Sequence, residues 1–283
     1  MNNLPTDNID KQVVSAFGEE WQRFDQQHLT EPTLQAIFDD YFHIFPWSSL
    51  PADAKGFDLG CGSGRWARFV APRVGQLHCI DPSSAALAVT QRNLHDQQNC
   101  QFHLASVDQI PLGEATQDFG YSLGVLHHVP DTLAGLKACT HKLRPGAPFL
   151  LYLYYAFDGK PWWFRVVWKL SDVARTIISR MPTSLKHLTA DVIACTIYWP
   201  LSRLSKLVEK MGLPVENIPL SFYRHKSFYV LRTDALDRFG TRLEKRFSKA
   251  QIQQMMTAAD LEKIVFSDRR PFWCAVGYKR ALG

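Results

Sequence analysis

Several features that mark other protein classes are missing from this sequence. Its six cysteines are scattered, and no two of them have the CxxC spacing of metal and redox sites. No run of about 18 uncharged apolar residues occurs, so a membrane-spanning helix is not expected. The N-terminus lacks the basic and apolar regions of a secretory signal. Because scattered cysteines suit a reducing compartment, the expected location is the cytoplasm.

Internal repeats and low-complexity tracts are also lacking, so the 283 residues suit one large domain or one domain with a substantial insertion. The charge is unevenly distributed. Residues 156–247 hold 16 Lys and Arg against 8 Asp and Glu, whereas the rest of the chain holds 16 against 19. Such a basic block favours an anionic partner, either a substrate or a membrane surface. The alternative is a solvated helical surface that is rich in arginine.

A regular alternation of strand and helix patterns is what the sequence does contain. Residues 10–45 carry apolar side chains at three- and four-residue spacing, which predicts helix. Short apolar runs then alternate with helical segments, which implies a parallel sheet covered on both faces. The expected strands are Lys55–Leu59, Gln76–Ile80, Gln101–Ala105, Asp118–Leu126 and Phe149–Tyr155, and the expected helices are Arg65–Ala71, Ser83–Asp96 and Thr132–Leu143.

This alternation stops near residue 156 and resumes at Ser248. The intervening stretch has helical patterns and little strand pattern. Ser248 and Gln251 predict a capping box at the start of a helix, and two short strands are expected after it, at Ile264–Ser267 and Phe272–Tyr278. The expected organisation is an N-terminal helical cap at 1–50, a core at 51–155, a helical insertion at 156–247 and a return to the core at 248–283.

A glycine-rich turn follows the first expected strand. Gly60, Gly62 and Gly64 let the backbone turn tightly and approach a ligand, and the helix N-terminus behind them favours a pyrophosphate or a carboxylate. A dinucleotide fingerprint places glycine at its first, third and sixth positions, and the sixth here is Arg65. Asp81 closes the second strand and can accept both ribose hydroxyls of an adenosine. Because the same residue would bind the ribose in a dinucleotide enzyme, Asp81 by itself does not distinguish such an enzyme from another adenosine-binding protein.

The run from Asp58 to Gly64, DLGCGSG, resembles the first signature of class I S-adenosylmethionine (SAM)-dependent methyltransferases. Three later segments resemble that family's next motifs in order: Ala105–Asp108, Asp118–Asp131 and Leu143–Ala147, the last with Ala147 in place of a glycine. The resemblance covers about residues 55–155 and 248–283. It implies SAM as cofactor and an α/β, Rossmann-like doubly wound fold. That fold has a seven-stranded sheet with an antiparallel last strand, an N-terminal helical segment and a large helical lid insertion.

The resemblance also assigns the cofactor site. It places Asp58 at the loop and the cofactor amino group, Asp81 at the ribose and Asp108 at the adenine amino group. Trp21 is expected to fold over the methionine moiety, or else to be an ordinary core anchor, and Arg65 to pair with the cofactor carboxylate. The complete expected set is Trp21, Asp58, Gly60, Cys61, Gly62, Gly64, Arg65, Asp81, Pro82, Val107, Asp108 and Leu123.

His127, after the fourth expected strand, is the predicted general base. An imidazole with an ordinary pKa of about 6.5 can accept a proton near neutrality, which favours an oxygen or carbon acceptor over nitrogen. The alternative is that His127 or His128 only caps a loop. No acidic cluster accompanies this strand, so no metal is expected. The Asn/Asp-Pro-Pro-aromatic signature of nucleic-acid methyltransferases is absent, so a small molecule is expected in place of nucleic acid.

The segment from Trp162 to Met181 predicts a basic amphipathic helix. Its apolar stripe favours the core face of a lid over the active site, and a peripheral contact with an anionic membrane is the alternative. The acceptor is expected to be anionic or hydrophobic. The residues expected to meet it are His128, Tyr154, Tyr155, Trp162 and Tyr223.

Other functions stay open at this point. SAM can donate its aminocarboxypropyl group or take part in cyclisation, and the cofactor motifs alone separate neither reaction from methyl transfer. A nicotinamide-dependent oxidoreductase and a non-catalytic SAM-binding protein are further alternatives. The sequence indicates no oligomeric state.

Overall fold

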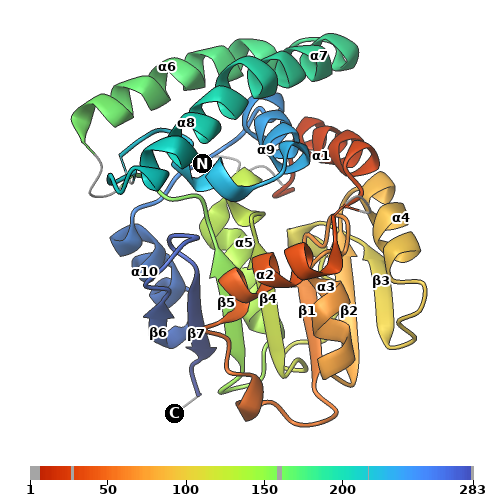
Figure 1. Cartoon of the computed structure of the whole chain (residues 1–283). Coiled ribbons are helices and arrows are strands. Elements are labelled where there is room, and N and C mark those ends of the chain that lie inside the picture. The colour runs from red at the N-terminus through yellow and green to blue at the C-terminus, as the bar shows by residue number, and fades with distance from the viewer. Residues whose placement is uncertain (1–6, 27–28, 158–160, 216, 282–283) are drawn as a thin grey trace, which may run out of the picture. The chain divides into compact units, whose positions relative to one another are not determined.

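A computed structural model describes residues 7–26, 29–157, 161–215 and 217–281. The chain divides into two compact units. Unit 1 consists of the chain up to Ala156 and from Leu243 onward, and unit 2 of Phe157–Arg242 (Figure 1). The insertion expected at 156–247 therefore differs from unit 2 mainly at its end, because the segment Leu243–Phe247 bonds to the core of unit 1.

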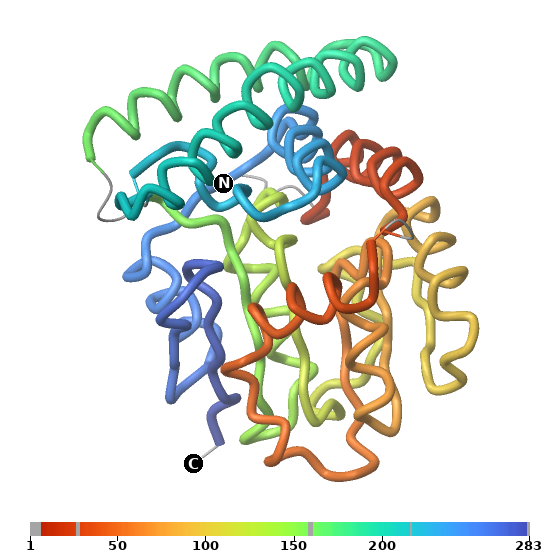
Figure 2. The backbone as a smooth tube through the Cα atoms, in the orientation of Figure 1, coloured from red at the N-terminus to blue at the C-terminus, as the bar shows by residue number. Residues whose placement is uncertain are grey.

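Unit 1 is built on a seven-stranded sheet with the strand order β3-β2-β1-β4-β5-β7-β6 (Figure 2). The first five strands are parallel, and β7 runs antiparallel to both of its neighbours. This topology confirms the predicted fold class. The strands are β1 (Lys55–Leu59), β2 (Gln76–Asp81), β3 (Cys100–Leu104), β4 (Phe119–Leu123), β5 (Pro148–Tyr152), β6 (Leu261–Phe266) and β7 (Ala275–Lys279).

Helices cover both faces of this sheet (Figure 1). On one face, buried residues of α2, α3 and α4 pack on strand residues such as Tyr121. On the other, Leu136 of α5 and Met256 of α10 pack on residues such as Phe149. Apolar side chains therefore leave most strands in both directions, as a doubly wound sheet requires. The helices of unit 1 are α1 (Lys11–Arg23), α2 (Glu31–Phe42), α3 (Ala67–Val70), α4 (Ser84–Asn93), α5 (Thr132–Lys142) and α10 (Lys249–Ala258).

The N-terminal segment, expected to be helical over 10–45, forms two helices, α1 and α2. Asp10 caps α1 by accepting bonds from the first backbone N–H groups. The helix ends at the buried Phe24, and α2 begins with Pro32 in its first turn, where proline's missing N–H costs no intrahelical bond. Helix α1 packs closely on α4, since a Cβ at Gly18 would lie 2.5 Å from Ser83 Oγ.

The ends of other elements also follow local chemistry. The capping box predicted at Ser248 and Gln251 is present at the start of α10. Strand β4 ends at Leu123 and not at residue 126, because Gly124 has a left-handed φ of 79° and Leu126–His128 forms a 3-10 turn. That turn places His127 after the carboxyl end of β4.

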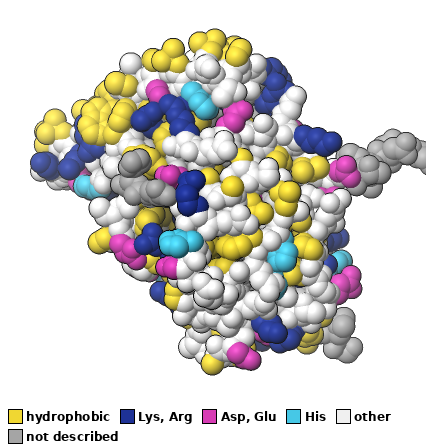
Figure 3. Space-filling model, turned by 90° about the vertical axis from the view of Figure 1, so that its right-hand side faces the viewer, with side chains coloured by type: hydrophobic (Ala, Val, Ile, Leu, Met, Phe, Trp, Pro, Cys, Tyr) yellow, Lys and Arg dark blue, Asp and Glu magenta, His cyan; other side chains and the backbone are white. Residues whose placement is uncertain are grey.

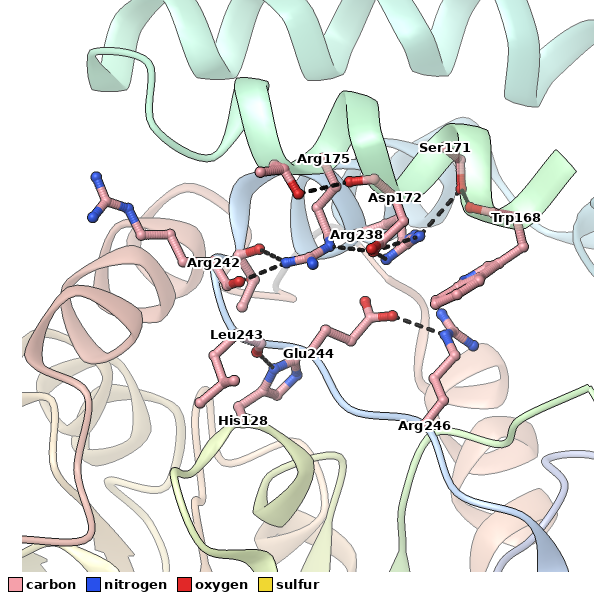
Figure 4. Close-up of polar contacts among 12 residues, drawn as sticks. His128, Trp168, Ser171, Asp172, Arg175, Arg238, Arg242, Leu243, Glu244 and Arg246 are labelled. Atoms are coloured by element: carbon pink, nitrogen blue, oxygen red, sulfur yellow. Dashed lines mark hydrogen bonds and ion pairs between the residues drawn. The ribbon is translucent and has the colours of Figure 1, made fainter. Parts of the chain in front are cut away.

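Unit 2 is helical. Its core joins Ile178, Tyr198 and Phe239 with smaller neighbours around α9. Asp172 of α6 pairs with both Arg175 and Arg238, and Arg175 also donates to the carbonyls of Thr241 and Arg242 (Figure 4). Among the described helices, none combines the length and apolarity that crossing a membrane requires. The helices are α6 (Trp162–Ile178), α7 (Thr183–Ile193), α8 (Trp199–Lys210) and α9 (Phe228–Gly240), with a π-helical segment, Ala194–Tyr198, joining α7 to α8.

Candidate active site

The candidate site lies where the direction of winding of the sheet reverses. β1 and β4 are neighbours in the sheet, and the strands wind outward from them in opposite directions. In open α/β sheets, ligands bind beyond the carboxyl ends of the strands at this switch point. The glycine-rich loop follows β1, Asp81 ends β2 and His127 follows β4, so the fold brings the main predicted residues to one edge.

All three glycines of the loop have left-handed backbone conformations. Their φ values are 76°, 58° and 77° at Gly60, Gly62 and Gly64, a region that other residues adopt only with strain. The loop is held from behind because Thr90 Oγ1 donates to the carbonyl of Gly62 at 2.6 Å, and its Oγ1 lies 3.5 Å from the buried Cys61 Sγ. The loop conformation is therefore set by unit 1 itself.

Trp21 of α1 lies directly on this loop. A Cβ placed at Gly62 would come within 2.9 Å of the indole, so glycine is needed for the close approach. The guanidinium carbon of Arg65 lies 5.3 Å from the centroid of the Trp21 ring and 4.4 Å from that of Trp66. The structure thus brings Trp21, Gly62 and Arg65 together, as the sequence analysis expected of cofactor-binding residues. Which ligand groups they contact is taken up as a proposal.

Asp81 connects the end of β2 to the loop. One carboxylate oxygen accepts the N–H of Gly62 at 3.0 Å and the other accepts the N–H of Ser83 at 2.8 Å. Burial raises the pKa of Asp81 to about 6, with these two hydrogen bonds opposing the shift. Above that pH the carboxylate carries a negative charge beside the loop, with further acceptor capacity for hydroxyl groups.

Asp58 is a buried carboxyl group. Among the described residues, its side-chain oxygens accept no hydrogen bond of ordinary geometry, and the Tyr121 hydroxyl lies nearby. Burial raises the pKa of Asp58 to about 8, and the Tyr121 hydroxyl opposes this shift. An unpaired buried carboxyl group is costly unless a ligand satisfies it. A cationic amino group such as that of SAM would do so, and the residues present therefore fit this cofactor.

The remaining predicted cofactor residues lie at the same edge of the sheet. Val107 and Asp108 form a short 3-10 helix after β3, in which Val107 is buried and Asp108 is exposed. Leu123 is buried at the end of β4, and Pro82 is half-buried after β2. This places an exposed carboxylate, Asp108, after β3, the strand next to the one that Asp81 ends.

His127 is fully buried. Its ring lies 3.8 Å from that of Tyr154 and 4.0 Å from that of His128, measured between centroids. Neither ring nitrogen has a hydrogen-bond partner within the described residues. Burial lowers the pKa of His127 well below its ordinary value, and the charges of His128 and Arg246 lower it further. The imidazole is therefore neutral near pH 7 and able to accept a proton.

A returning segment of the chain, Leu243–Phe247, holds the turn that carries His127. The N–H of Lys245 donates to the carbonyl of His127 at 3.1 Å, and His128 Nδ1 lies 2.6 Å from the carbonyl of Leu243 (Figure 4). Phe247 N–H donates to the carbonyl of Tyr154 at 2.8 Å. This segment therefore fixes His127 and Tyr154 from a position far along the sequence.

Two residues of that segment were missed by the sequence analysis. Arg246 Nε donates to Glu244 at 2.8 Å (Figure 4). Its guanidinium carbon lies 5.2 Å from the centroid of the Tyr154 ring. The sequence analysis had assigned both residues to the insertion. In the sequence, Leu243 and Phe247 are apolar and the three residues between them are charged, so no period-two alternation marks this segment as extended.

The predicted substrate residues divide between the two units. Tyr154 and His128 meet around His127, and Tyr155 lies next to them, paired with Phe247. Trp162 is 75% exposed on α6, and Tyr223 packs on Tyr198 in the core of unit 2. The structure thus gathers three of the five at one place in unit 1. In the described ranges, no three His, Cys, Asp or Glu side chains are grouped as a metal site needs.

Comparison with known proteins was then made. A family model described as "Methyltransferase domain" matches residues 57–151. Phosphoethanolamine N-methyltransferase 2 of Caenorhabditis elegans is 28% identical over 134 residues, covering 46% of this chain and 29% of that protein. The ubiquinone biosynthesis O-methyltransferase of Acinetobacter baumannii (strain AYE) is 34% identical over 100 residues, covering 34% and 41%. The chain thus spans less than half the length of these curated relatives.

Among solved structures, the CurJ carbon methyltransferase is similar in fold, with a TM-score of 0.56 at 10% identity over 96% of this chain and 62% of that one. This likeness supports the fold alone. The family match spans the segment that carries Asp58, Asp81, Asp108 and His127, and it confirms SAM as the predicted cofactor.

Proposed function

We propose that this chain, whose residues 57–151 match a methyltransferase family model, transfers the methyl group of SAM to an oxygen or carbon atom of a small molecule. The observation that carries this proposal is the juxtaposition of two groups at the ends of adjacent strands. The buried carboxyl group of Asp58 lies near the end of β1, and the buried, neutral imidazole of His127 follows β4. One suits a cationic cofactor and the other suits removal of a proton.

The residues that hold the cofactor follow from their positions. Asp58 would accept the ammonium group, Asp81 the ribose hydroxyls and Asp108 the adenine amino group. Trp21 would cover the methionine moiety, and Arg65, which stacks on it, would pair with the carboxylate. Bound SAM supplies a methyl group on a sulfonium, which is already a good leaving group. The protein's contribution is therefore positioning and proton removal.

His127 would take the acceptor's proton on a ring nitrogen. Its lowered pKa keeps it neutral but also makes it a weak base, so an anionic acceptor intermediate needs further stabilisation. Arg246, held by Glu244 beside the Tyr154 ring, supplies a cation next to the histidine. This combination favours a hydroxyl or acidic C–H acceptor, because an amine needs less help to lose its proton.

The acceptor itself would be an anionic or hydrophobic small molecule. Tyr154, Tyr155 and His128 would contact it from unit 1, where their side chains gather around His127. The two curated relatives match only part of this chain, so their names select no acceptor. All six cysteines are free thiols, which supports the cytoplasm as the proposed location.

Calorimetric titration of the purified chain with SAM and with NAD tests the cofactor. Incubation with SAM and a panel of phenols, carbon acids and amines, followed by mass spectrometry, tests the reaction. S-adenosylhomocysteine with an acceptor heavier by one methyl group is the expected result. Methylthioadenosine with a heavier addition would instead indicate aminocarboxypropyl transfer, and acceptor cyclisation without methylation would indicate ring closure. Binding of NAD and not SAM would overturn the proposal altogether.

A further inference from the structure

The outer face of unit 2 is apolar in a way that its own packing does not explain. On α6, exposed apolar residues recur at the spacing of one helix face, at Val166, Leu170, Val173 and Ile177. Their exposed fractions are 46%, 66%, 62% and 59%. The residues of α6 that are buried are Arg175 and Ile178, on another side of the helix. Helix α6 therefore packs through a side that contains an arginine and leaves its apolar stripe outside.

Helices α7 and α8 repeat this arrangement. The buried residues of α7 are Lys186 and Ala190, and those of α8 are Ser202 and Ser205. Large apolar side chains on both helices are exposed: Leu185, Leu188, Val192, Trp199, Leu204 and Leu207. Three successive helices thus expose large apolar side chains, and monomeric proteins rarely expose extended apolar patches to water.

The rim of this surface is cationic. On α6, Arg165 and Lys169 are exposed beside the apolar stripe, and Arg180 is exposed just after the helix ends. The helix has one acidic residue, Asp172, and that residue is paired with Arg175 and Arg238. Figure 3 shows hydrophobic side chains along the upper edge, at the height of α6 and α7 in Figure 1, with Lys and Arg side chains beside them.

We propose that this face of unit 2, formed by the outward sides of α6, α7 and α8, docks on the surface of an anionic lipid bilayer. Apolar helix faces flanked by lysine and arginine bind in the plane of such membranes, through buried apolar area and attraction to anionic lipids. Trp162, 75% exposed at the start of α6, and its neighbour Trp163 suit the headgroup level.

Charge distinguishes this occupant from others. A second copy seated on the same face would bring its own cationic rim to an interface that already carries one, and like charges oppose such pairing. A nucleic acid would satisfy the cations but leave the apolar stripe in water. An anionic bilayer satisfies both. Docking does not depend on the proposed methyl transfer. An apolar acceptor taken from the lipid is a consequence that rests on the proposed function.

Vesicle co-sedimentation of the full chain tests the docking. Vesicles of phosphatidylcholine mixed with phosphatidylglycerol should retain the protein, and pure phosphatidylcholine vesicles should retain much less. The double variant Leu170→Ser/Val173→Ser should weaken binding by about tenfold or more, because it removes two apolar side chains that would be buried in the bilayer. Arg165→Gln or Lys169→Gln should each weaken binding to the anionic vesicles by about fivefold and leave the phosphatidylcholine result unchanged.

Val265→Ser is the matched control, since Val265 is 52% exposed on β6 of unit 1. It should bind as the wild type does. Circular dichroism and thermal unfolding of each variant establish that it folds. The proposal is wrong if the double variant binds anionic vesicles as well as the wild type does, or if Val265→Ser loses as much. A lipid-free dimer that the double variant dissociates would assign the surface to a second copy.

Discussion

In unit 1, the large apolar side chains of strands and helices point inward, and both faces of the sheet are covered. In unit 2, α6, α7 and α8 are also rich in apolar residues, yet most of these are exposed and several of the buried positions are polar. The same kind of residue therefore does different work in the two units. In unit 1 it stabilises the fold, and in unit 2 it forms a surface available for binding.

This difference also separates the sources of stability. Unit 1 derives its stability from burying apolar area on two faces of a sheet. Unit 2 has a small core around α9 and adds a network in which Asp172 joins two mostly buried arginines. Charged networks of this kind are sensitive to loss of one member, whereas exposed apolar residues are not.

The largest predicted effect compares two leucines. Leu136 on α5 is fully buried in unit 1, and Leu170 on α6 is 66% exposed in unit 2. Leu136→Ala should lower the free energy of unfolding by about 2–5 kcal/mol, because it leaves a cavity in a packed core. Leu170→Ala should change it by less than about 0.5 kcal/mol. Chemical denaturation of both variants measures this, and a similar loss in each would refute the contrast between the units.

The second prediction concerns His127. His127→Ala should lower kcat by about 10²-fold, because a positioned base is lost, and should leave SAM affinity within about twofold. The kcat of the wild type, measured at saturating SAM, should stay constant down to about pH 6.5 and fall only below that pH, since the pKa of the buried imidazole is lowered. Steady-state kinetics on the methylated acceptor provide the measurement. A variant with near-normal turnover would place the base elsewhere.

A third, smaller effect follows from the raised pKa of Asp58. Below its pKa of about 8 the carboxyl group is protonated in the free protein, and a bound ammonium would favour its ionised form. SAM binding near pH 7 should therefore release a proton, and affinity should rise by at most about tenfold per pH unit up to pH 8.

Asp58→Asn provides the matched comparison. The amide cannot ionise, so the ratio of wild-type to variant affinity should grow between about pH 6 and 8 and then level off. Without ligand, this variant should be more stable than the wild type near neutral pH. A raised carboxyl pKa costs the wild-type fold stability as pH rises from the ordinary value towards 8, and the amide removes this cost. An affinity ratio that stayed constant with pH would show that Asp58 does not bind the ammonium group.

The smallest predicted effect lies in unit 2. Asp172→Ala removes the acceptor shared by Arg175 and Arg238, and it should destabilise unit 2 by about 1–2 kcal/mol. The estimate is modest because the aspartate is one-third exposed and the arginines keep other partners. Limited proteolysis should cut within Phe157–Arg242 sooner in this variant. The SAM affinity of the variant should stay within about twofold of the wild-type value. A larger loss would mean that this network affects the cofactor site.

Much of unit 1 was predictable because its signals are local. β1 has the predicted bounds, Lys55–Leu59, since a short apolar run ending at glycines has few other interpretations. The capping box of α10 needs only Ser248 and Gln251, three positions apart. Helix was also expected over 10–45, and that range does form helices; the break between α1 and α2, at Phe24 and Pro32, was not predicted.

The surroundings of His127 were not predictable in the same way. They depend on Leu243 and Lys245, which bond to the 127–128 turn from more than a hundred residues away. Likewise, periodicity predicts that α6 is amphipathic but does not say which side packs. The sequence analysis favoured burial of the apolar stripe, and in unit 2 the side with Arg175 is buried instead.

The chain leaves unit 1 after Ala156 and re-enters it through Leu243–Phe247, and these two stretches are hydrogen-bonded to each other at Tyr154, Ala156 and Phe247. An inserted unit whose entry and exit are tied together can be exchanged without reopening the sheet. Replacement of the helices between Phe157 and Arg242 would therefore leave these hydrogen bonds, which all lie in unit 1, in place.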